Sequence, residues 1–145
     1  MKRRMIISVI AVLLCMLLLY GCSGGQQTVN VDVEICDDYY IATINNILDN
    51  FADYYGKTVR IEGLFFAHGT DTIWRMVMRY NLVCCGLVGI QVGWQEENEY
   101  PENYSWVEAI GTLGWVERGE SRLMGIHLSS LNVVDEASGQ RFVSH

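Results

Sequence analysis

Basic residues are scarce in this sequence, and their scarcity limits the partners that the protein can have. Ten Lys and Arg residues stand against seventeen Asp and Glu residues, which gives a formal charge of −7. Nucleic acids are held chiefly by clusters of Lys and Arg that contact their phosphate groups. We therefore expect no nucleic-acid partner for this chain.

The residue groupings that mark catalytic sites are also missing. No Ser-His-Asp combination, pair of catalytic carboxylates or phosphate-binding glycine loop stands out in the sequence. A cysteine nucleophile would need a neighbouring base, and none can be assigned. Internal repeats and low-complexity segments are absent as well. The sequence therefore favours a binding or structural module over an enzyme.

The longest apolar run lies at the N-terminus. Three basic residues precede the apolar residues 5–19, and this order is typical of a secretory signal peptide. A permanent membrane span would need about 20 apolar residues. The following motif LYGC, which ends at Cys22, resembles the bacterial lipobox, in which the cysteine is lipidated. We expect residues 1–21 to be a cleaved signal peptide, and the alternative is an uncleaved signal anchor.

Lipidation at Cys22 would hold the protein on the extracytoplasmic face of the cell membrane, because two acyl chains anchor stably. Cleavage removes three of the ten basic residues and none of the acidic ones, so the mature charge falls to −10. Residues 22–30 are typical of a lipidated, flexible tether. Residues 31–136 are long enough for one domain, and residues 137–145 are expected to form a C-terminal tail.

The first part of the domain is expected to hold one strand and one helix. Residues 29–35 alternate apolar and polar side chains, which predicts a strand. Asp37 and Asp38 are suited to cap a following helix. Apolar residues then recur at spacings of three and four as far as Gly56. This pattern predicts a helix at about residues 38–55 with one face on the core.

From residue 57 onward the pattern predicts strands. Alternating or β-branched segments occupy residues 57–67, 73–85, 88–94, 105–117 and 121–134, the last two as a hairpin. Glycines inside the first and fourth of these segments suit a sharply coiled sheet, because glycine often marks a bulge or corner. Five strands after one helix predict a mainly β protein, a small OB-like barrel.

Four segments appear in an order and spacing that resemble a known family. They are GKTVRIEG (56–63), RYNLVCCG (79–86), VGIQV (88–92) and WVEAIGTL (106–113). Over residues 31–135 the chain resembles the domain of unknown function numbered 1980, an OB-like domain of small Gram-positive lipoproteins and permease-associated membrane proteins. The resemblance implies an extracytoplasmic barrel that acts with a permease in metal handling. Relatives often carry an acidic residue soon after the paired cysteines, whereas this chain has none before Glu96.

Three cysteines remain beyond Cys22, namely Cys36, Cys84 and Cys85. An odd number of cysteines outside the cytoplasm indicates a free or reactive thiol. Neighbouring residues of a regular strand point to opposite faces, so Cys84 and Cys85 can act together only on a bulge or turn. Gly86, which follows them directly, permits such a turn.

Several roles for the cysteine pair stay open. A disulfide between neighbours is strained and would form a labile redox switch, and a disulfide from Cys36 would tie the N-terminal strand to the barrel. The two thiolates could also hold a soft metal ion such as zinc, with Cys36, His68 or His127 completing the shell, although zinc sites usually space their thiolates further apart. Both thiols could instead fill the barrel end as small apolar side chains. With the resemblance, we favour metal binding.

The tryptophans offer a second kind of site. Strand alternation sets Val107 and Ala109 on one face and Trp106 on the other. If the first face is core, Trp106 lies outside and can stack on a sugar or peptide; the alternative is that the tryptophans plug the barrel ends. His68, at an expected hairpin tip, and His127, on a strand, are weaker ligand candidates. The alternative function is therefore a module that contacts wall polymer or protein, with structural cysteines.

Overall fold

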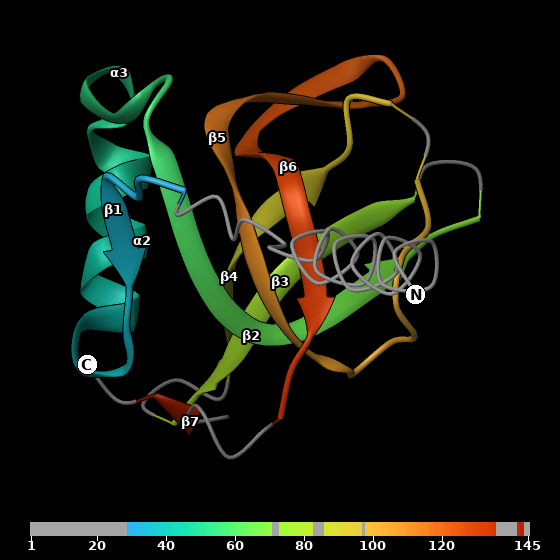
Figure 1. Ribbon diagram of the computed structural model, residues 1–145, viewed down its shortest axis with the longest axis horizontal. Helices are drawn as coiled ribbons and strands as arrows, with labels where there is room; N and C mark the ends of the chain where they lie inside the picture. The colour runs from blue at the N-terminus through green and yellow to red at the C-terminus, as the bar shows by residue number, and fades with distance from the viewer. Residues whose placement is uncertain (1–28, 71–72, 83–85, 97, 136–141, 144–145) are drawn as a thin grey trace, which may run out of the picture.

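A computed structural model shows a small barrel with helices along one side (Figure 1). The residues that it describes are 29–70, 73–82, 86–96, 98–135 and 142–143. The predicted signal peptide, the lipidated Cys22 and the pair Cys84–Cys85 lie outside these ranges. Within them, no helix has the length and apolar character needed to cross a membrane.

Five long strands form the barrel. Their bounds are β2 (Thr58–His68), β3 (Trp74–Asn81), β4 (Gly86–Gly93), β5 (Trp106–Arg118) and β6 (Ser121–Val133). Antiparallel pairings join β2 to β5, β5 to β6, β3 to β4 and β2 to β3, and a parallel pairing of β4 with β6 completes the ring. The prediction of a mainly β protein built on a small five-stranded barrel is confirmed.

Two short strands extend the sheet. β1 (Val33–Ile35) pairs in parallel with β2, and β7 (Phe142–Val143) pairs in parallel with β3. The strand predicted at residues 29–35 is therefore shorter than its alternation indicates. Within the predicted tail at 137–145, Val143 of β7 is buried in the main core. A two-residue strand is too short to produce a periodic pattern in the sequence.

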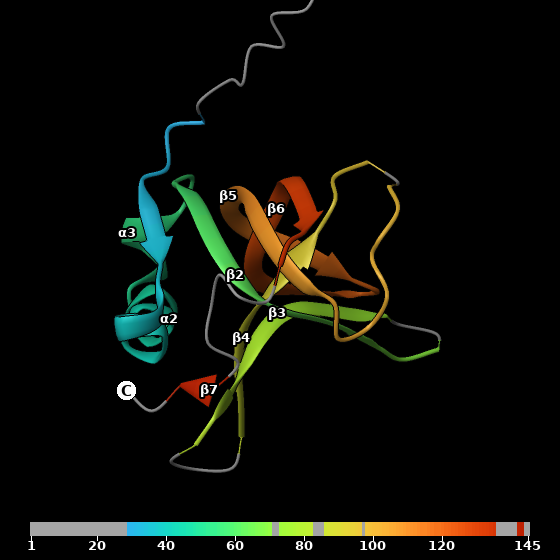
Figure 2. The same ribbon diagram turned by 60° about the horizontal axis from the view of Figure 1, so that its bottom comes forward.

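The predicted helix is present as three consecutive pieces. They are the 3-10 helix η1 (Asp37–Tyr39), α2 (Tyr40–Asp49) and α3 (Phe51–Tyr54). Tyr40, Ile44 and Ile47 recur at spacings of four and three, and all three are buried against the main core. Figure 2 shows that these helices stand together on one side of the barrel.

The core has two parts. The larger lies inside the barrel and under α2, and it includes Val107, Ala109 and Leu113, the face of β5 that alternation predicts as core. The smaller lies on the opposite face of β2, β3 and β5 and consists of Leu64, Met78 and Trp106.

The prediction that Trp106 lies outside as an aromatic contact is wrong. Trp106 is only 4% exposed. Alternation does turn it away from the barrel interior, but this outer face is itself covered by side chains that form the smaller core. The partly buried side chains packed around that core are Phe66, Met76, Tyr80 and Val134.

Candidate functional site

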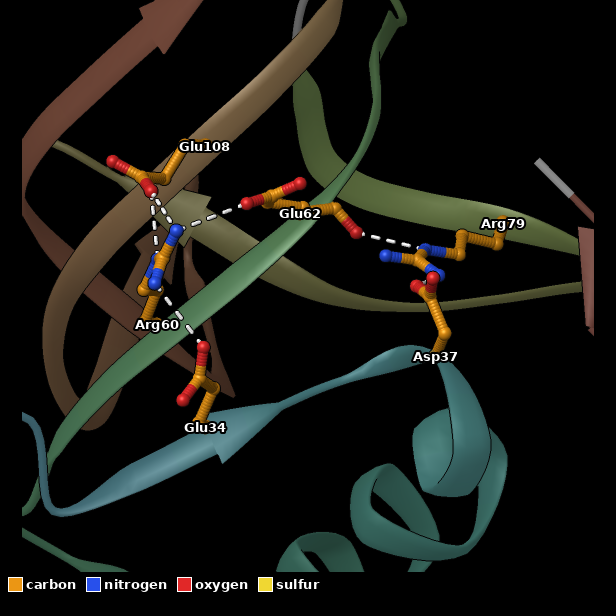
Figure 3. Close-up of polar contacts among 6 residues, drawn as sticks. All are labelled: Glu34, Asp37, Arg60, Glu62, Arg79 and Glu108. Carbon is orange, nitrogen blue, oxygen red and sulfur yellow. Dashed lines mark hydrogen bonds and ion pairs between the residues drawn. The ribbon is translucent and has the colours of Figure 1, made fainter. Parts of the chain in front are cut away.

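A cluster of ionic side chains lies where β1, β2 and β5 meet (Figure 3). In the sheet register, Glu62 of β2 lies directly opposite Glu108 of β5, and Glu34 of β1 lies opposite Arg60 of β2. Two carboxylates in opposite positions on neighbouring strands repel each other. The arrangement therefore needs a cation between them.

Arg60 supplies that cation. Its guanidinium nitrogens lie 3.1 Å from the nearest carboxylate oxygens of Glu34 and Glu62 and 2.6 Å from that of Glu108. Partial burial by itself lowers the pKa of Arg60, but the three carboxylates together raise that pKa above its ordinary value. Arg60 thus stays charged and joins the three strands.

Arg79 of β3 is a buried charge, only 1% exposed. Its Nη1 pairs with the carboxylate of Asp37 in η1, and its Nε donates a 2.9 Å hydrogen bond to the backbone carbonyl of Glu62 (Figure 3). The guanidinium carbon lies 4.4 Å from the ring centre of Tyr40 and 5.1 Å from that of Trp106. A buried charge is tolerated only when it is paired in this way. Arg79 therefore ties the helical segment to the barrel.

The prediction that Asp37 and Asp38 cap the helix is wrong. Neither η1 nor α2 has a side-chain hydrogen bond at its N-cap. Asp37 is used by Arg79 instead, since leaving a buried guanidinium without a counter-charge costs more free energy than leaving a helix end uncapped.

Tyr40 is packed beneath Arg79. Burial raises the pKa of Tyr40 well above its ordinary value, although the charge of Arg79 lowers it in part. In the described structure the Tyr40 hydroxyl has no hydrogen-bond partner. A buried hydroxyl without a partner destabilises the fold.

Removing that hydroxyl is expected to be harmless. Tyr40→Phe should leave the free energy of unfolding in urea unchanged or raise it by up to about 1 kcal/mol, because it deletes an unpaired polar atom. Tyr40→Ala, which also deletes the ring, should lower it by about 3–5 kcal/mol. A loss above about 1 kcal/mol for Tyr40→Phe would show that the hydroxyl makes a stabilising hydrogen bond.

A pocket of about 310 Å³ opens beside the two arginines. Cys36, an exposed free thiol between β1 and η1, lies in its lining. Glu34 and Asp37 in the same lining are engaged by Arg60 and Arg79. Over the ranges that the structure describes, no group of three or more His, Cys, Asp or Glu side chains is arranged to hold a metal ion. The pocket is therefore a site of ion pairs.

A second pocket, of about 280 Å³, lies on the barrel between β4, β5 and β6 and beside the loop that follows β4. We call it the aromatic cleft. The residues that define it are Trp94, Tyr100, Trp115, Gln91, Gln95 and His127.

The walls of the aromatic cleft are held by contacts among aromatic and basic side chains. The backbone N–H of Trp94 donates a 3.1 Å hydrogen bond to the hydroxyl of Tyr100, and the guanidinium carbon of Arg75 lies 4.2 Å from the Tyr100 ring centre. The ring of Trp115 packs edge-on against Phe51 of α3, with 5.1 Å between ring centres. These contacts hold the rings of Tyr100 and Trp115 in place.

The ends of two hairpins meet beside this cleft. Trp74, at the start of β3, donates a 2.9 Å hydrogen bond from its indole Nε1 to Oε1 of Gln91. Arg118, at the end of β5, stacks on the Trp74 ring at 4.1 Å. A surface tryptophan is in this way linked to the cleft floor.

The described strand ends fix where Cys84 and Cys85 fall in the topology. Asn81 of β3 pairs with Gly86 of β4, so four residues connect these two strands. The backbone N–H of Leu82 donates a 3.0 Å hydrogen bond to the carbonyl of Val143, which brings β7 beside the start of the connection (Figure 2). The pair lies outside the described residues, so its metal-binding or redox role stays a prediction.

The other predicted ligands lie apart from one another. His68 ends β2, is exposed, and stacks on the Phe66 ring with 6.1 Å between ring centres. His127 lines the aromatic cleft, and Cys36 lines the pocket beside the arginines. These three residues belong to three different pockets and do not form one site with each other.

The sequence pattern does not reveal the aromatic cleft. Among the tryptophans, strand alternation singles out Trp106, which the structure buries. Trp94 lies just beyond β4, and Trp115 belongs to the part of β5 that extends past its pairing with β2. Only the closure of the barrel brings these rings to one cleft.

Comparison with known proteins identifies the family. No curated protein and no solved structure matches the chain. The model of the DUF1980 C-terminal domain matches residues 24–141, a span that includes the helices and all five barrel strands. The predicted resemblance is thereby confirmed at the level of the family, and the chain belongs to the DUF1980 C-terminal domain family, a domain of unknown function.

Proposed function

We propose that this protein is a non-enzymatic binding module, anchored by lipid outside the cell membrane, that holds zinc through Cys84 and Cys85. The pairing of Asn81 with Gly86 carries the proposal. Because β3 and β4 pair up to these two residues, only four residues, with Cys84 and Cys85 among them, join the two strands along the chain. In a regular strand they would point to opposite faces, whereas a hairpin turn allows both thiolates to face one ion.

The donor set fits a soft metal ion. Thiolates favour zinc and copper(I), and zinc takes four ligands in tetrahedral geometry. Two thiolates therefore leave positions that another residue or a partner can fill. This suits a protein that passes an ion to a membrane partner, for which a permease is the candidate.

The surface beside the hairpin connection supports a docking role. Leu82, Leu87 and Phe142 are large apolar side chains that are about half exposed or more. Tyr80 pairs in register with both Leu87 and Phe142, and its ring stacks on Phe142 at 5.5 Å, so the group is contiguous. Exposed apolar groups of this kind often mark contacts with another protein.

Two further observations support the anchor and the fold assignment. The family match begins at residue 24, just after the lipidation candidate Cys22. The closed ring of five strands, with one parallel pairing between β4 and β6, supports an OB-like barrel.

The proposal predicts a stoichiometric metal adduct. Native mass spectrometry of residues 23–145, purified with zinc and without reductant, should give the mass of the protein plus one zinc ion. Cys84→Ser/Cys85→Ser should remove the adduct, and Cys36→Ser is the matched control for loss of a thiol. An adduct that survives the double substitution would contradict the proposal.

The same spectra separate the alternatives. A metal-free mass lower by two hydrogens would indicate a disulfide and a redox switch instead, and peptide mapping would show whether Cys36 takes part. An unmodified mass with and without zinc would indicate that the cysteines only pack. The function would then be that of a module that contacts wall polymer or protein, for which the aromatic cleft is the candidate surface.

A further inference from the structure

Exposed aromatic rings gather around the aromatic cleft. Trp115 and Trp74 are 44% and 41% exposed, and Trp94 and Tyr100 form half-buried walls. A folded domain gains free energy by burying tryptophan, so exposed rings beside a pocket are typical of a ligand site. None of these residues belongs to the hairpin connection that carries Cys84 and Cys85, so the inference does not depend on metal binding.

Besides one arginine and one glutamate, Arg75 and Glu117, the polar lining of the cleft consists of two amides and an imidazole. Gln91 and Gln95 carry amides, each with both donor and acceptor atoms, and a neutral His127 ring has one of each. The amide of Gln91 is held by the hydrogen bond that it accepts from Trp74. Sugar hydroxyls also donate and accept, so this set of groups is matched to them.

Charge argues against an anionic ligand. Arg75, which belongs to the lining, stacks on the ring of Tyr100, and Arg118 beside the cleft stacks on that of Trp74. Glu117 adds a carboxylate to the lining, and the chain as a whole carries a formal charge of −7. The net negative charge of the chain disfavours a phosphate polymer.

At the floor of the cleft the strand pairing leaves no place for an added peptide strand. Such binding needs a free strand edge, but Gln91 is paired on both sides, with Met76 of β3 and Gly125 of β6. We propose that the aromatic cleft binds a neutral saccharide chain. The exposed ring of Trp115 stacks on a sugar ring, and Gln95 and His127 bond to its hydroxyls.

The cleft is organised before the ligand arrives. Trp115 is held by Phe51 of α3. At the neighbouring Gly114, an added Cβ would lie 2.7 Å from the His127 ring. The absence of a side chain at Gly114 therefore provides the space in which the His127 ring lies. Fixed side chains lower the ordering cost of binding.

Isothermal titration of the full-length chain in detergent, with three neutral tetrasaccharides, tests the proposal. The probes are the β-1,4-linked tetramers of N-acetylglucosamine and glucose and the α-1,4-linked tetramer of glucose. At least one should bind with one site per chain. Trp115→Ala should weaken its affinity about tenfold or more, because it deletes the stacking surface.

Two further variants guard against a folding defect. Gln95→Ala changes an exposed side chain and should weaken binding about threefold through the loss of one hydrogen bond. Tyr39→Ala deletes an exposed aromatic ring on η1, outside the cleft, and should leave affinity unchanged.

The outcomes decide the proposal. The proposal would be overturned if the parent protein bound none of the three sugars. It would also be overturned if Trp115→Ala and Gln95→Ala both bound with the affinity of the parent. Binding of a phosphate polymer or an extended peptide that Trp115→Ala abolishes, without sugar binding, would assign the cleft to another ligand. Cys84→Ser/Cys85→Ser should bind the sugar as the parent does, which separates this inference from the metal proposal.

Discussion

Asp37→Ala is expected to lower the free energy of unfolding by about 3 kcal/mol. The substitution leaves the guanidinium of Arg79 buried without its carboxylate partner. The remaining contacts of Arg79, with the carbonyl of Glu62 and the rings of Tyr40 and Trp106, carry no full negative charge. Urea denaturation at neutral pH, followed by circular dichroism, measures the loss.

A double substitution distinguishes an unpaired charge from a general loss of packing. Arg79→Met removes the buried charge, so Asp37→Ala/Arg79→Met should be more stable than Asp37→Ala alone by about 1 kcal/mol or more. Glu34→Ala is the control, because it breaks an ion pair with Arg60 that is more exposed, and it should cost at most about 1 kcal/mol. A double variant no more stable than Asp37→Ala would show that the Arg79 charge is not the cause.

Gly111→Ala is expected to destabilise the barrel by about 3 kcal/mol, close to the upper end for an overpacked core. The register of β5 and β6 shifts between Ile110 and Gly111, which brings the two backbones together. A Cβ at Gly111 would overlap the backbone carbonyl oxygen of His127 and lie 2.7 Å from Cγ2 of Ile126. Backbone atoms in a closed barrel are held by pairing on both sides, so their displacement costs free energy.

Gly114→Ala on the same strand is the matched control. Its Cβ would meet only the ring of His127, at 2.7 Å, and a side chain can rotate. We expect a loss of about 1 kcal/mol by urea denaturation. Equal losses at Gly111 and Gly114 would mean that crowding of the backbone at the bulge does not decide the stability.

The repeated local patterns of the sequence determined the elements. Alternation from Thr58 to His68 and again through β5 and β6 is a property of neighbouring residues, and a strand with one buried face produces it directly. The same holds for the buried helix positions Tyr40, Ile44 and Ile47. Glycines inside strands indicated the sharp coiling, and Gly111 does lie at the register shift.

The ion pairs, the smaller core and the aromatic cleft depend on which helices and strands come into contact. A local sequence pattern does not contain that information. Asp37 has the position of a helix cap in the sequence. In the structure its carboxylate instead pairs with the guanidinium of Arg79, which lies forty-two residues later in the chain. Trp106 faces away from the barrel interior as alternation predicts, yet Leu64 and Met78 from other strands bury it there.

The aromatic cleft shows the same division. The spacing of Trp94, Tyr100 and Trp115 in the sequence does not mark them as neighbours. Trp94 and Tyr100 follow β4 and Trp115 belongs to β5, and the order of the strands in the sheet differs from their order in the chain. The sequence by itself determined the helix, the barrel strands, the family and the anchor prediction. Only the tertiary structure decided which charged side chains pair and which aromatic rings remain exposed. Both depend on the pairing of strands that are distant in the sequence, and closure of the barrel removes water from charges that must then be paired.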